Sequence, residues 1–307
     1  MQAMAFRKYG GPEVLESMEL PEPKVGPDWV LIRARAASVN PVDWKVRQGG
    51  LDALIPAYFP VISGWDVAGV VERVGPAVPD VHPGDEVIAY NRQDYLQWGT
   101  YAELVAAPLR TVGPKPPAAT WEQAAALPLV GLTAYQSLTE RLAVRAGETV
   151  LVHAASGGVG LMAVQIARVL GAEVIGTASE RNHERLRALG VTPVTYGDGL
   201  VDRVRALRPD GVDAVLDLAG GQALDDSPAL VRDRARMTSI VDPRVLDLGG
   251  QYEFVRPDRD QLARLAGWVD EGRVQIDVGA TLPLEEAAEA QRMQEAGEVQ
   301  GKIVLTV

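Results

Sequence analysis

Residues 150–179 read VLVHAASGGVGLMAVQIARVLGAEVIGTAS, and this stretch decides the fold. Its apolar start predicts a buried strand over Thr149–His153, and its apolar end predicts another over Glu173–Thr177. Between them, a glycine cluster opens a helical pattern that runs from Gly158 to Leu170. A strand, a glycine-rich turn, a helix and a second strand in this order are typical of a unit that binds a dinucleotide.

The glycine cluster lies where the first strand turns into the helix. A tight turn without Cβ atoms lets the backbone approach a pyrophosphate, and the helix N-terminus points free N–H groups at it. The spacing is Ala155-x-Gly157-x-x-Gly160, with alanine where the usual motif has its first glycine. An ordinary strand–helix turn is the alternative. The complete context favours dinucleotide binding by the six residues of the turn, Ala155, Ser156, Gly157, Gly158, Val159 and Gly160.

The end of the second strand bears on which dinucleotide binds. Sites for NAD place a carboxylate there for the ribose hydroxyls, whereas this chain has Ala178. Ser179 and Arg181 follow and suit a 2′-phosphate, because a guanidinium matches a phosphate dianion. Glu180 could instead reach a ribose, and Arg181 could be a solvated helix-start residue. The pattern favours NADPH over NADH as the cofactor.

Composition and charge restrict the class of protein. The 307 residues suffice for about two domains, and 47% hydrophobic residues are ordinary for a globular chain. The net charge of −11 argues against nucleic acid as a partner, since a phosphate backbone requires a basic face. The sequence has no apolar run of about 20 residues and no basic-then-apolar leader. We therefore expect a cytoplasmic protein with no membrane partner.

The chain offers few metal ligands. It has no cysteine, which rules out disulfides and thiolate metal sites. Its three histidines, His82, His153 and His183, are far apart and form no His-x-x-x-His pair. We therefore expect no metal. His153 lies inside the predicted strand, so we expect a core histidine with satisfied hydrogen bonds rather than a base.

The pattern of elements changes along the chain. Residues 1–120 are β-rich, because short apolar runs are bounded by glycine and proline, as at Trp29–Arg35, Ala68–Val74 and Glu86–Tyr90. The proline-rich stretch Gly113–Thr120 is the first plausible domain boundary. Alternating strands and helices follow, which predicts a parallel sheet with helices on both faces.

Several elements of this second region have local signals. Thr120 is placed to cap a helix, with Gln123 as its capping-box partner. A helix over residues 180–190 ends at Gly190, and two further strands are predicted over Asp213–Gly220 and Ala235–Val241. From about Asp258 two helical segments precede a terminal strand in GKIVLTV.

Several separate motifs occur in one order along nearly the whole chain, and together they resemble the medium-chain dehydrogenase/reductase family, in its zinc-free quinone oxidoreductase branch. They are ASVNPVDWKVRQG (37–49), GWDVAGVVERVG (64–75), PGDEVIAY (83–90), GTYAELV (99–105), ALPLVGLTAYQSL (126–138), HAASGGVG (153–160) and GKIVL (301–305). The resemblance implies an α/β fold in which a Rossmann-type, doubly wound parallel sheet is inserted into a β-rich, GroES-like catalytic domain. Residues 1–120 and 258–307 would form the catalytic domain, and residues 121–257 the dinucleotide domain. A homodimer is also implied.

The resemblance also bears on metal chemistry. Zinc alcohol dehydrogenases of the family have a cysteine where this chain has Asn40 and a histidine where it has Trp65. Lewis-acid activation of an alcohol is therefore not expected. Direct hydride transfer from NADPH to a quinone or an α,β-unsaturated carbonyl remains. The protein would orient this acceptor, exclude water and donate hydrogen bonds to the enolate oxygen.

Two residues are candidates for catalysis by resemblance. Asn40 would lie beside the nicotinamide, where its amide could donate to a developing oxyanion; alternatively it is a turn residue before Pro41. Tyr58 in IPAYFP could donate a proton or stack on a flat acceptor, and simple burial of its ring is the alternative. Some family members place a tyrosine nearer to Val61. Trp65 would fill the volume of the zinc histidine and form a flat wall.

Further residues complete the predicted sites. Tyr90, Tyr95 and Trp98 fall in the aromatic loop AYNRQDYLQWG, which either lines the acceptor pocket or is a surface loop. Resemblance places Thr133 near the nicotinamide carboxamide and Tyr196 near the adenosine ribose phosphate. The remaining cofactor candidates are Ala219, Gly220, Ile240 and Val241 at strand ends, and Lys302 on the pyrophosphate. Lys302 could equally be a terminal-strand lysine with no such role.

Other functions stay open at this point. The chain could bind NADPH without turnover, as a sensor or accessory protein, because no fixed general acid is evident. It could also be an enoyl-thioester reductase, although that would need a basic groove that the acidic charge balance does not favour. A metal-dependent alcohol dehydrogenase has the least support from the sequence.

Overall fold

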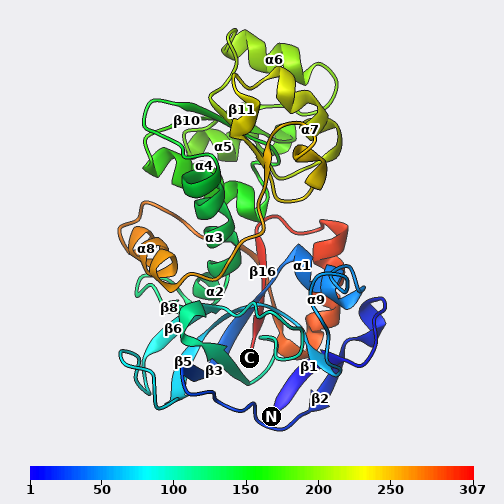
Figure 1. Ribbon diagram of the computed structural model, residues 1–307, viewed down its shortest axis with the longest axis vertical. Coiled ribbons are helices and arrows are strands. Elements are labelled where there is room, and N and C mark those ends of the chain that lie inside the picture. The colour runs from blue at the N-terminus through cyan, green and yellow to red at the C-terminus, as the bar shows by residue number, and fades with distance from the viewer. The chain divides into compact units, whose positions relative to one another are not determined.

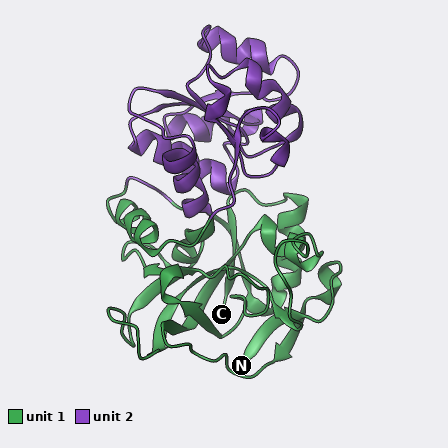
Figure 2. Cartoon of the chain, viewed as in Figure 1, with its two compact units in different colours: residues 1–129, 256–272, 276–307 green, residues 130–255, 273–275 purple.

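The computed structural model describes residues 1–307 and divides into two compact units (Figures 1 and 2). Unit 1 comprises residues 1–129, 256–272 and 276–307, and unit 2 comprises residues 130–255 and 273–275. Unit 2 is thus inserted into the sequence of unit 1. The sequence-based boundaries at residues 120 and 257 lie close to these divisions. Helix α2 (Trp121–Ala125) belongs to unit 1 because it packs on that unit's strands.

Unit 2 is built on a sheet of six strands in the order β11-β10-β9-β12-β13-β14. All of its neighbouring strands pair in parallel. This order places the first strand beside the fourth, so the chain winds outward from the middle in both directions, as in doubly wound dinucleotide-binding sheets. The strands are β9 (Thr149–Val152), β10 (Glu173–Thr177), β11 (Thr192–Val194), β12 (Ala214–Asp217), β13 (Met237–Ser239) and β14 (Gln251–Tyr252).

Helices cover both faces of this sheet, which confirms the predicted α/β class. The helices are α4 (Gly158–Val169), α5 (His183–Ala188), α6 (Leu200–Leu207) and α7 (Gly221–Asp226). On one face Leu151 and Val215 share a core with Leu200 of α6 and Leu224 of α7. On the other face Gly176 faces Ala155 and Leu186 of α5. Successive strand residues alternate between the faces, so strands buried on both sides are apolar throughout.

Unit 1 contains a seven-stranded sheet in which β3 (Trp29–Val39) is the organising strand. The order is β15-β16-β3-β5-β6-β8, and β7 also pairs with β3. Alternate residues of β3, Val30, Ile32 and Ala34, point into one core with residues of the other strands. The partners are β5 (Asp66–Val74), β6 (Glu86–Tyr90), β7 (Leu104–Pro108), β8 (Val112–Pro114), β15 (Val278–Pro283) and β16 (Lys302–Thr306).

A second, three-stranded sheet and the helices α1 (Pro41–Arg47), α2, α8 (Arg259–Asp270) and α9 (Ala287–Ala296) complete unit 1, whereas most of α3 (Pro128–Gln136) belongs to unit 2. The sheet has the order β2-β1-β4, with β1 (Gln2–Phe6), β2 (Glu16–Glu19) and β4 (Val61–Ile62). Arg47 is fully buried and donates from Nε to Gln291 of α9 over 2.7 Å. This bond ties α1 to the distant C-terminal segment.

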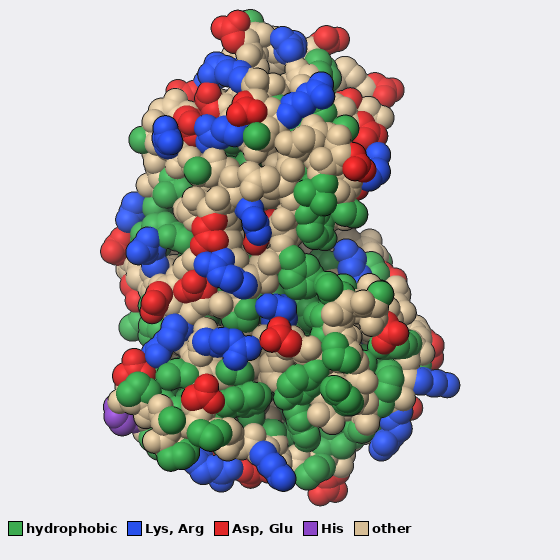
Figure 3. Space-filling model, in the orientation of Figure 1, with side chains coloured by type: hydrophobic (Ala, Val, Ile, Leu, Met, Phe, Trp, Pro, Cys, Tyr) green, Lys and Arg blue, Asp and Glu red, His purple; other side chains and the backbone are tan.

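The predicted cap of α2 is confirmed. Thr120 Oγ1 accepts from the backbone N–H of Gln123, and the Gln123 side chain accepts from the N–H of Thr120. Acidic and basic side chains are interspersed on the face of the molecule shown in Figure 3. None of the helices is both long enough and apolar enough to cross a membrane.

Candidate cofactor and acceptor sites

The glycines in the turn from β9 into α4 are there for different reasons. A Cβ added to Gly160 would lie 2.3 Å from the carbonyl oxygen of Ala154, so this position requires glycine because α4 begins in close contact with the backbone of the turn. A Cβ added to Gly157 would meet only that same oxygen, at 3.4 Å, which is ordinary contact. Gly157 is exposed and precedes the helix in an extended conformation, with φ −77°. The fold itself therefore does not explain glycine at position 157.

The N-terminus of α4 is suited to an anion. The first N–H groups of a helix lack intrahelical partners, and the helix dipole places partial positive charge there. Gly158 and Val159 are half-buried at this end, and Ala155 is fully buried behind them. The usual first glycine is not needed at Ala155, because the residue with positive φ in this turn is Ala154, at 49°.

The end of β10 carries a polar cluster that includes a residue missed in the sequence analysis. Asn182 donates from Nδ2 to Ser156 Oγ over 3.0 Å and to Ser179 Oγ over 3.2 Å. It thereby brings the glycine turn and the β10 end together. Ala178 is buried and carries no carboxylate, whereas Glu180, two residues later, is exposed. Asn182 gave no sequence signal beyond its position after the strand.

The loop after β11 lies at the same edge of the sheet, since β10 and β11 are parallel. Arg203 of α6 holds this loop by donating from Nε to Thr195 O over 3.0 Å and from NH1 to Asp198 O over 2.8 Å. Tyr196 between them is 57% exposed, and Arg181 is also exposed. Both predicted side chains are thus free of the core.

The ends of β12 and β13 are tied together by a second pair that sequence reasoning missed. Asp217 Oδ1 accepts from the backbone N–H groups of Ala219 and Gly220, at 3.0 and 2.8 Å. Its Oδ2 accepts from Ser239 Oγ over 2.7 Å, and Ser239 Oγ accepts from the N–H of Val241 over 3.2 Å. The predicted residues Ala219, Gly220, Ile240 and Val241 therefore lie at one edge. A polar residue ending each apolar strand is the signal that could have revealed the pair.

His153 is a core histidine with satisfied hydrogen bonds, as predicted. It is fully buried, with Nε2 3.1 Å from Ser227 Oγ and Nδ1 3.4 Å from Thr177 Oγ1. Ser227 donates its own hydrogen to Ala223 O, so it accepts from His153 Nε2–H. Burial lowers the pKa of His153 to about 4, which favours the neutral ring.

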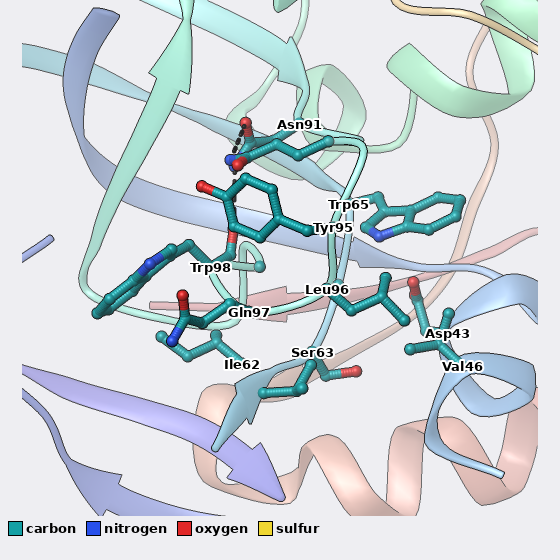
Figure 4. Close-up of a pocket in the computed structure, with 14 residues that line it drawn as sticks. Asp43, Val46, Ile62, Ser63, Trp65, Asn91, Tyr95, Leu96, Gln97 and Trp98 are labelled. Atoms are coloured by element: carbon teal, nitrogen blue, oxygen red, sulfur yellow. Dashed lines mark hydrogen bonds between the residues drawn. The ribbon is translucent and has the colours of Figure 1, made fainter. Parts of the chain in front are cut away.

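Unit 1 contains a pocket whose lining combines flat aromatic and amide side chains (Figure 4). It is lined by Asp43, Val46, Val61, Ile62, Ser63, Gly64, Trp65, Asn91, Gln93, Tyr95, Leu96, Gln97, Trp98 and Gly99. In the view of Figure 4, Trp65 and Asp43 lie on one side, and Tyr95 and Trp98 on the other. Asp43, Ser63 and Gln93 are polar lining residues that the sequence analysis did not single out.

Only three of the five aromatic candidates line this pocket. Trp65, Tyr95 and Trp98 line this pocket. Tyr90 does not: it is fully buried, and its ring packs edge-on against Trp65 with centroids 6.1 Å apart. Tyr58 is 55% exposed, and its ring centroid lies 6.1 Å from that of Tyr95. Tyr58 is not among the lining residues, and its role in catalysis stays a prediction.

Asn40 and Lys302 lie together in a buried polar network behind the pocket. Asn40 Nδ2 donates to Asp66 Oδ2 over 2.9 Å, and Asn40 Oδ1 accepts from Lys302 Nζ over 2.5 Å. Lys302 also donates to Val39 O over 2.8 Å. Asp66 Oδ2 accepts from Ser38 Oγ as well. The amide of Asn40 and the ammonium of Lys302 are thus engaged within the protein, and their predicted contacts with the cofactor stay predictions.

Three titratable groups of this network are buried, and burial shifts the pKa of each. It raises the pKa of Asp66 to about 6, against the opposing charge of Lys302. It raises the pKa of Asp43 to about 7 and lowers the pKa of Lys302. In each case the charged form loses solvation that its neighbours only partly replace.

The residues around Asn40 and Trp65 do not fit a zinc ion. Only two carboxylates, Asp43 and Asp66, lie nearby, and each is held by hydrogen bonds to neighbouring groups. Nowhere do three or more His, Cys, Asp or Glu side chains form a group that could hold a metal. Zinc in proteins takes mainly cysteine and histidine ligands, and none is present here.

Two family descriptions match the chain. Residues 26–117 match the alcohol dehydrogenase GroES-like domain family, and residues 189–305 match the zinc-binding dehydrogenase family. The first match lies within unit 1, so the predicted GroES-like domain is confirmed.

Curated relatives align over most of the chain. The chloroplast envelope quinone oxidoreductase homolog of Arabidopsis thaliana is 31% identical, over 99% of this chain and 98% of the relative. The chloroplastic NADPH-dependent alkenal/one oxidoreductase of the same plant is 33% identical, over 99% of this chain and 79% of the relative. The quinone oxidoreductase of Mus musculus is 30% identical, over 94% and 92%.

Solved structures share the whole fold. The quinone oxidoreductase from Coxiella burnetii superposes with a TM-score of 0.88 at 33% identity, covering 100% of this chain and 99% of its own. A structure described as an NAD-dependent alcohol dehydrogenase gives 0.90 at 35% identity, covering 100% of both chains. A mycobacterial protein complexed with NADPH gives 0.86 at 31% identity, also covering 100% of both.

Proposed function

Because the chain belongs to the medium-chain dehydrogenase/reductase superfamily, we propose that it transfers hydride from NADPH to a quinone or an α,β-unsaturated carbonyl without zinc. Its relatives include quinone and alkenal oxidoreductases, so the chain is classed as an oxidoreductase for small-molecule substrates. The proposal adds the cofactor, the acceptor class and the independence from metal.

The observation that carries the choice of NADPH is the polar cluster at the end of β10. Ser156, Ser179 and Asn182 form this cluster, and no carboxylate stands at Ala178 to take ribose hydroxyls. Arg181 adds an exposed cation next to it in the sequence. A relative that uses NADPH by name and a neighbour complexed with NADPH support this choice. One solved neighbour is described as an NAD-dependent alcohol dehydrogenase, so the experiment must also compare NADH with NADPH.

The predicted site residues are the ones that we propose would hold NADPH. The turn residues Ala155, Ser156, Gly157, Gly158, Val159 and Gly160 would offer backbone N–H groups to its pyrophosphate. Ser179, Arg181 and Tyr196 would take the 2′-phosphate. Thr133, Ala219, Gly220, Ile240 and Val241 would border the rest of the cofactor, and we propose Lys302 as a pyrophosphate contact. When bound, the reduced nicotinamide supplies a hydride.

The acceptor pocket of unit 1 supports a flat, already electrophilic substrate. Trp65, Tyr95 and Trp98 present aromatic surface that would orient a planar ring or enone and keep water from it. A quinone or enone holds the developing negative charge on its own oxygen, so no Lewis acid is needed. The pocket would then have to provide hydrogen-bond donors for that oxygen.

Spectrophotometric turnover tests the proposal. Purified protein is mixed with NADPH or NADH and a panel of quinones, enones and saturated aldehydes, with and without a zinc chelator. We expect NADPH consumption with quinones or enones only, unaffected by the chelator. Tight NADPH binding by calorimetry without turnover of any acceptor would contradict the proposal and favour a sensor. Preference for NADH, or activity that follows stoichiometric zinc, would contradict the cofactor or the metal claim.

The predicted homodimer is a separate proposal. Light scattering on the purified chain tests it, and a monomer across micromolar concentrations would exclude it.

A further inference from the structure

Asp43 has one oxygen that the fold uses and one that it does not. Asp43 Oδ2 accepts from the backbone N–H of Asn40 and from the hydroxyl of Tyr101, both over 2.8 Å. The first bond completes the start of α1, where an acid three residues after the cap is favourable. Oδ1 is buried and has no hydrogen-bond partner in the protein. A buried polar atom without a partner is costly, so its retention calls for an explanation.

Asp43 is also a lining residue of the acceptor pocket (Figure 4). It is 2% exposed, and it is the only ionisable acid in the pocket wall. Capping α1 explains Oδ2 but leaves Oδ1 unexplained. Because Asp43 lines the pocket, a ligand bound there is the candidate partner for Oδ1.

The charges around Asp43 favour a proton on this carboxyl. Asp66 and Lys302 share the same buried network, so two carboxyls face one ammonium. Tyr101 donates to Oδ2, and Tyr90 is a further buried hydroxyl in the same electrostatic environment. Because Oδ2 already accepts two hydrogen bonds, the proton belongs on Oδ1, where it becomes a donor. A carboxylic acid kept neutral by burial is an established kind of oxyanion donor.

We propose that Asp43 is the proton donor of the acceptor pocket, with its Oδ1–H hydrogen-bonded to the carbonyl oxygen of a bound quinone or enone. This proposal rests on the proposed function, since it requires hydride transfer to such an acceptor. It supplies the general acid that no motif in the sequence identified.

With an enone, the hydride and the proton go to different atoms of the acceptor. A bound reduced nicotinamide would give up a hydride from its own C–H bond and be left oxidised. The hydride would form a C–H bond at the β-carbon of the enone, and the electron pair of the C=C bond would shift so that the carbonyl oxygen gains the negative charge. The O–H bond of Asp43 breaks, an O–H bond forms on that oxygen, and Asp43 is left as a carboxylate. The product is an enol, which then tautomerises to the saturated carbonyl. A proton from water restores neutral Asp43 before the next turnover.

The primary test is Asp43→Asn. The side-chain oxygen of asparagine can still accept from Asn40 and Tyr101, and its NH2 can still donate to the acceptor, but it cannot release a proton. We expect kcat with an enone to fall about 100-fold or more, with little change in KM. Circular dichroism and thermal unfolding check that the variant is folded.

The pH profile separates a proton donor from a merely structural residue. Burial raises the pKa of Asp43 to about 7, so wild-type kcat should fall as the pH rises through that range. The Asp43→Asn variant should lose this decline. A carboxylate that only caps α1 would not make kcat decline with rising pH.

Two neighbouring variants should move the decline in opposite directions. Tyr101→Phe removes a hydrogen bond that stabilises the carboxylate, so the midpoint should move to higher pH. Asp66→Asn removes a negative charge that disfavours the carboxylate, so the midpoint should move to lower pH. These two variants test the role of Asp43 as proton donor even if the Asp43→Asn variant does not fold.

The outcomes separate this proposal from the function on which it rests. Wild-type protein that reduces no quinone or enone overturns the proposed function. Wild-type turnover with an Asp43→Asn variant of equal kcat and equal pH profile overturns the role of Asp43 alone. Midpoints that do not move, or that move the same way in both neighbouring variants, overturn it as well.

Discussion

The side-chain nitrogen of Asn40 lies 2.9 Å from Oδ2 of Asp66, and both residues are fully buried although they are distant in sequence. Lys302 reaches the same amide from near the C-terminus, so three separate segments of the chain meet at one point of unit 1. Buried ions are stable only while their partners are present. The loss of one partner of this network should therefore destabilise unit 1.

Replacing Lys302 with methionine should destabilise unit 1. The variant leaves the buried carboxylate of Asp66 without a counter-charge, and breaking such a pair costs about 3–5 kcal/mol. Urea unfolding should show a loss of that size in the free energy of unfolding. Adding Asp66→Asn to the same chain should restore part of it.

The same variant tests two roles of Lys302. Unchanged stability would contradict the prediction from the network. The resemblance instead predicts weaker NADPH binding, and calorimetry on the folded variant measures that effect separately.

Alanine at the two glycines of the β9–α4 turn should have opposite consequences. Gly160→Ala places a Cβ 2.3 Å from a backbone oxygen, so overpacking should cost about 1–3 kcal/mol of stability. Gly157→Ala meets no close atom, so stability should hardly change. If the pyrophosphate approaches Gly157, this second variant should nevertheless bind NADPH about 10-fold or more weakly, because its Cβ would occupy the path of the phosphates.

Thermal unfolding and calorimetry on both variants check this pair. Equal NADPH affinity in the Gly157→Ala variant and the wild type would show that the pyrophosphate does not pass this glycine. A fully stable Gly160→Ala variant would contradict the packing argument.

The sequence predicted the fold where local signals and burial agree. The strand Glu173–Thr177 and the strand Glu86–Tyr90 have the predicted bounds, and the cap at Thr120 forms as expected. The strand β15 was not predicted, because only Leu282 of its six residues is buried and its pairing with β16 is set by the fold. Edge strands of this kind carry weak patterns.

The sites were less accessible to sequence reasoning because their polar contacts join distant segments. The Asn182 bonds to Ser156 and Ser179 depend on how β10 aligns with β9. The position of Asp43 in the pocket depends on loops far along the chain. An aromatic residue such as Tyr90 reads the same in the sequence whether it lines the pocket or, as here, packs behind Trp65.

Replacing Arg181 with alanine should change cofactor preference rather than stability. Arg181 is exposed, so the free energy of unfolding should stay within about 0.5 kcal/mol. If it pairs with the 2′-phosphate, the dissociation constant for NADPH should rise about 10-fold, while that for NADH should not change. The matched control is Arg187→Ala, another exposed arginine in the following helix. Equal losses for both cofactors, or a loss in the control, would remove Arg181 from phosphate recognition.

The buried ring of His153 should make the protein sensitive to acid. Burial lowers the pKa of His153 to about 4, below the ordinary 6.5. Between these values the unfolded chain takes up a proton that the folded chain refuses, so stability present above pH 6.5 is lost as the pH falls toward 4. The full effect is roughly 3 kcal/mol.

Denaturant unfolding from pH 7 to pH 4 measures this dependence. Buried Asp43 and Asp66, whose pKa values are raised, act in the opposite sense, so the wild type must be compared with His153→Gln at each pH. The variant keeps a donor toward Ser227 but cannot be protonated, so the stability advantage of the wild type should shrink as the pH falls. His82→Gln is the control for the substitution itself, because the His82 side chain is 74% exposed. A wild-type advantage that is independent of pH would show that His153 is protonated alike in the folded and unfolded chain.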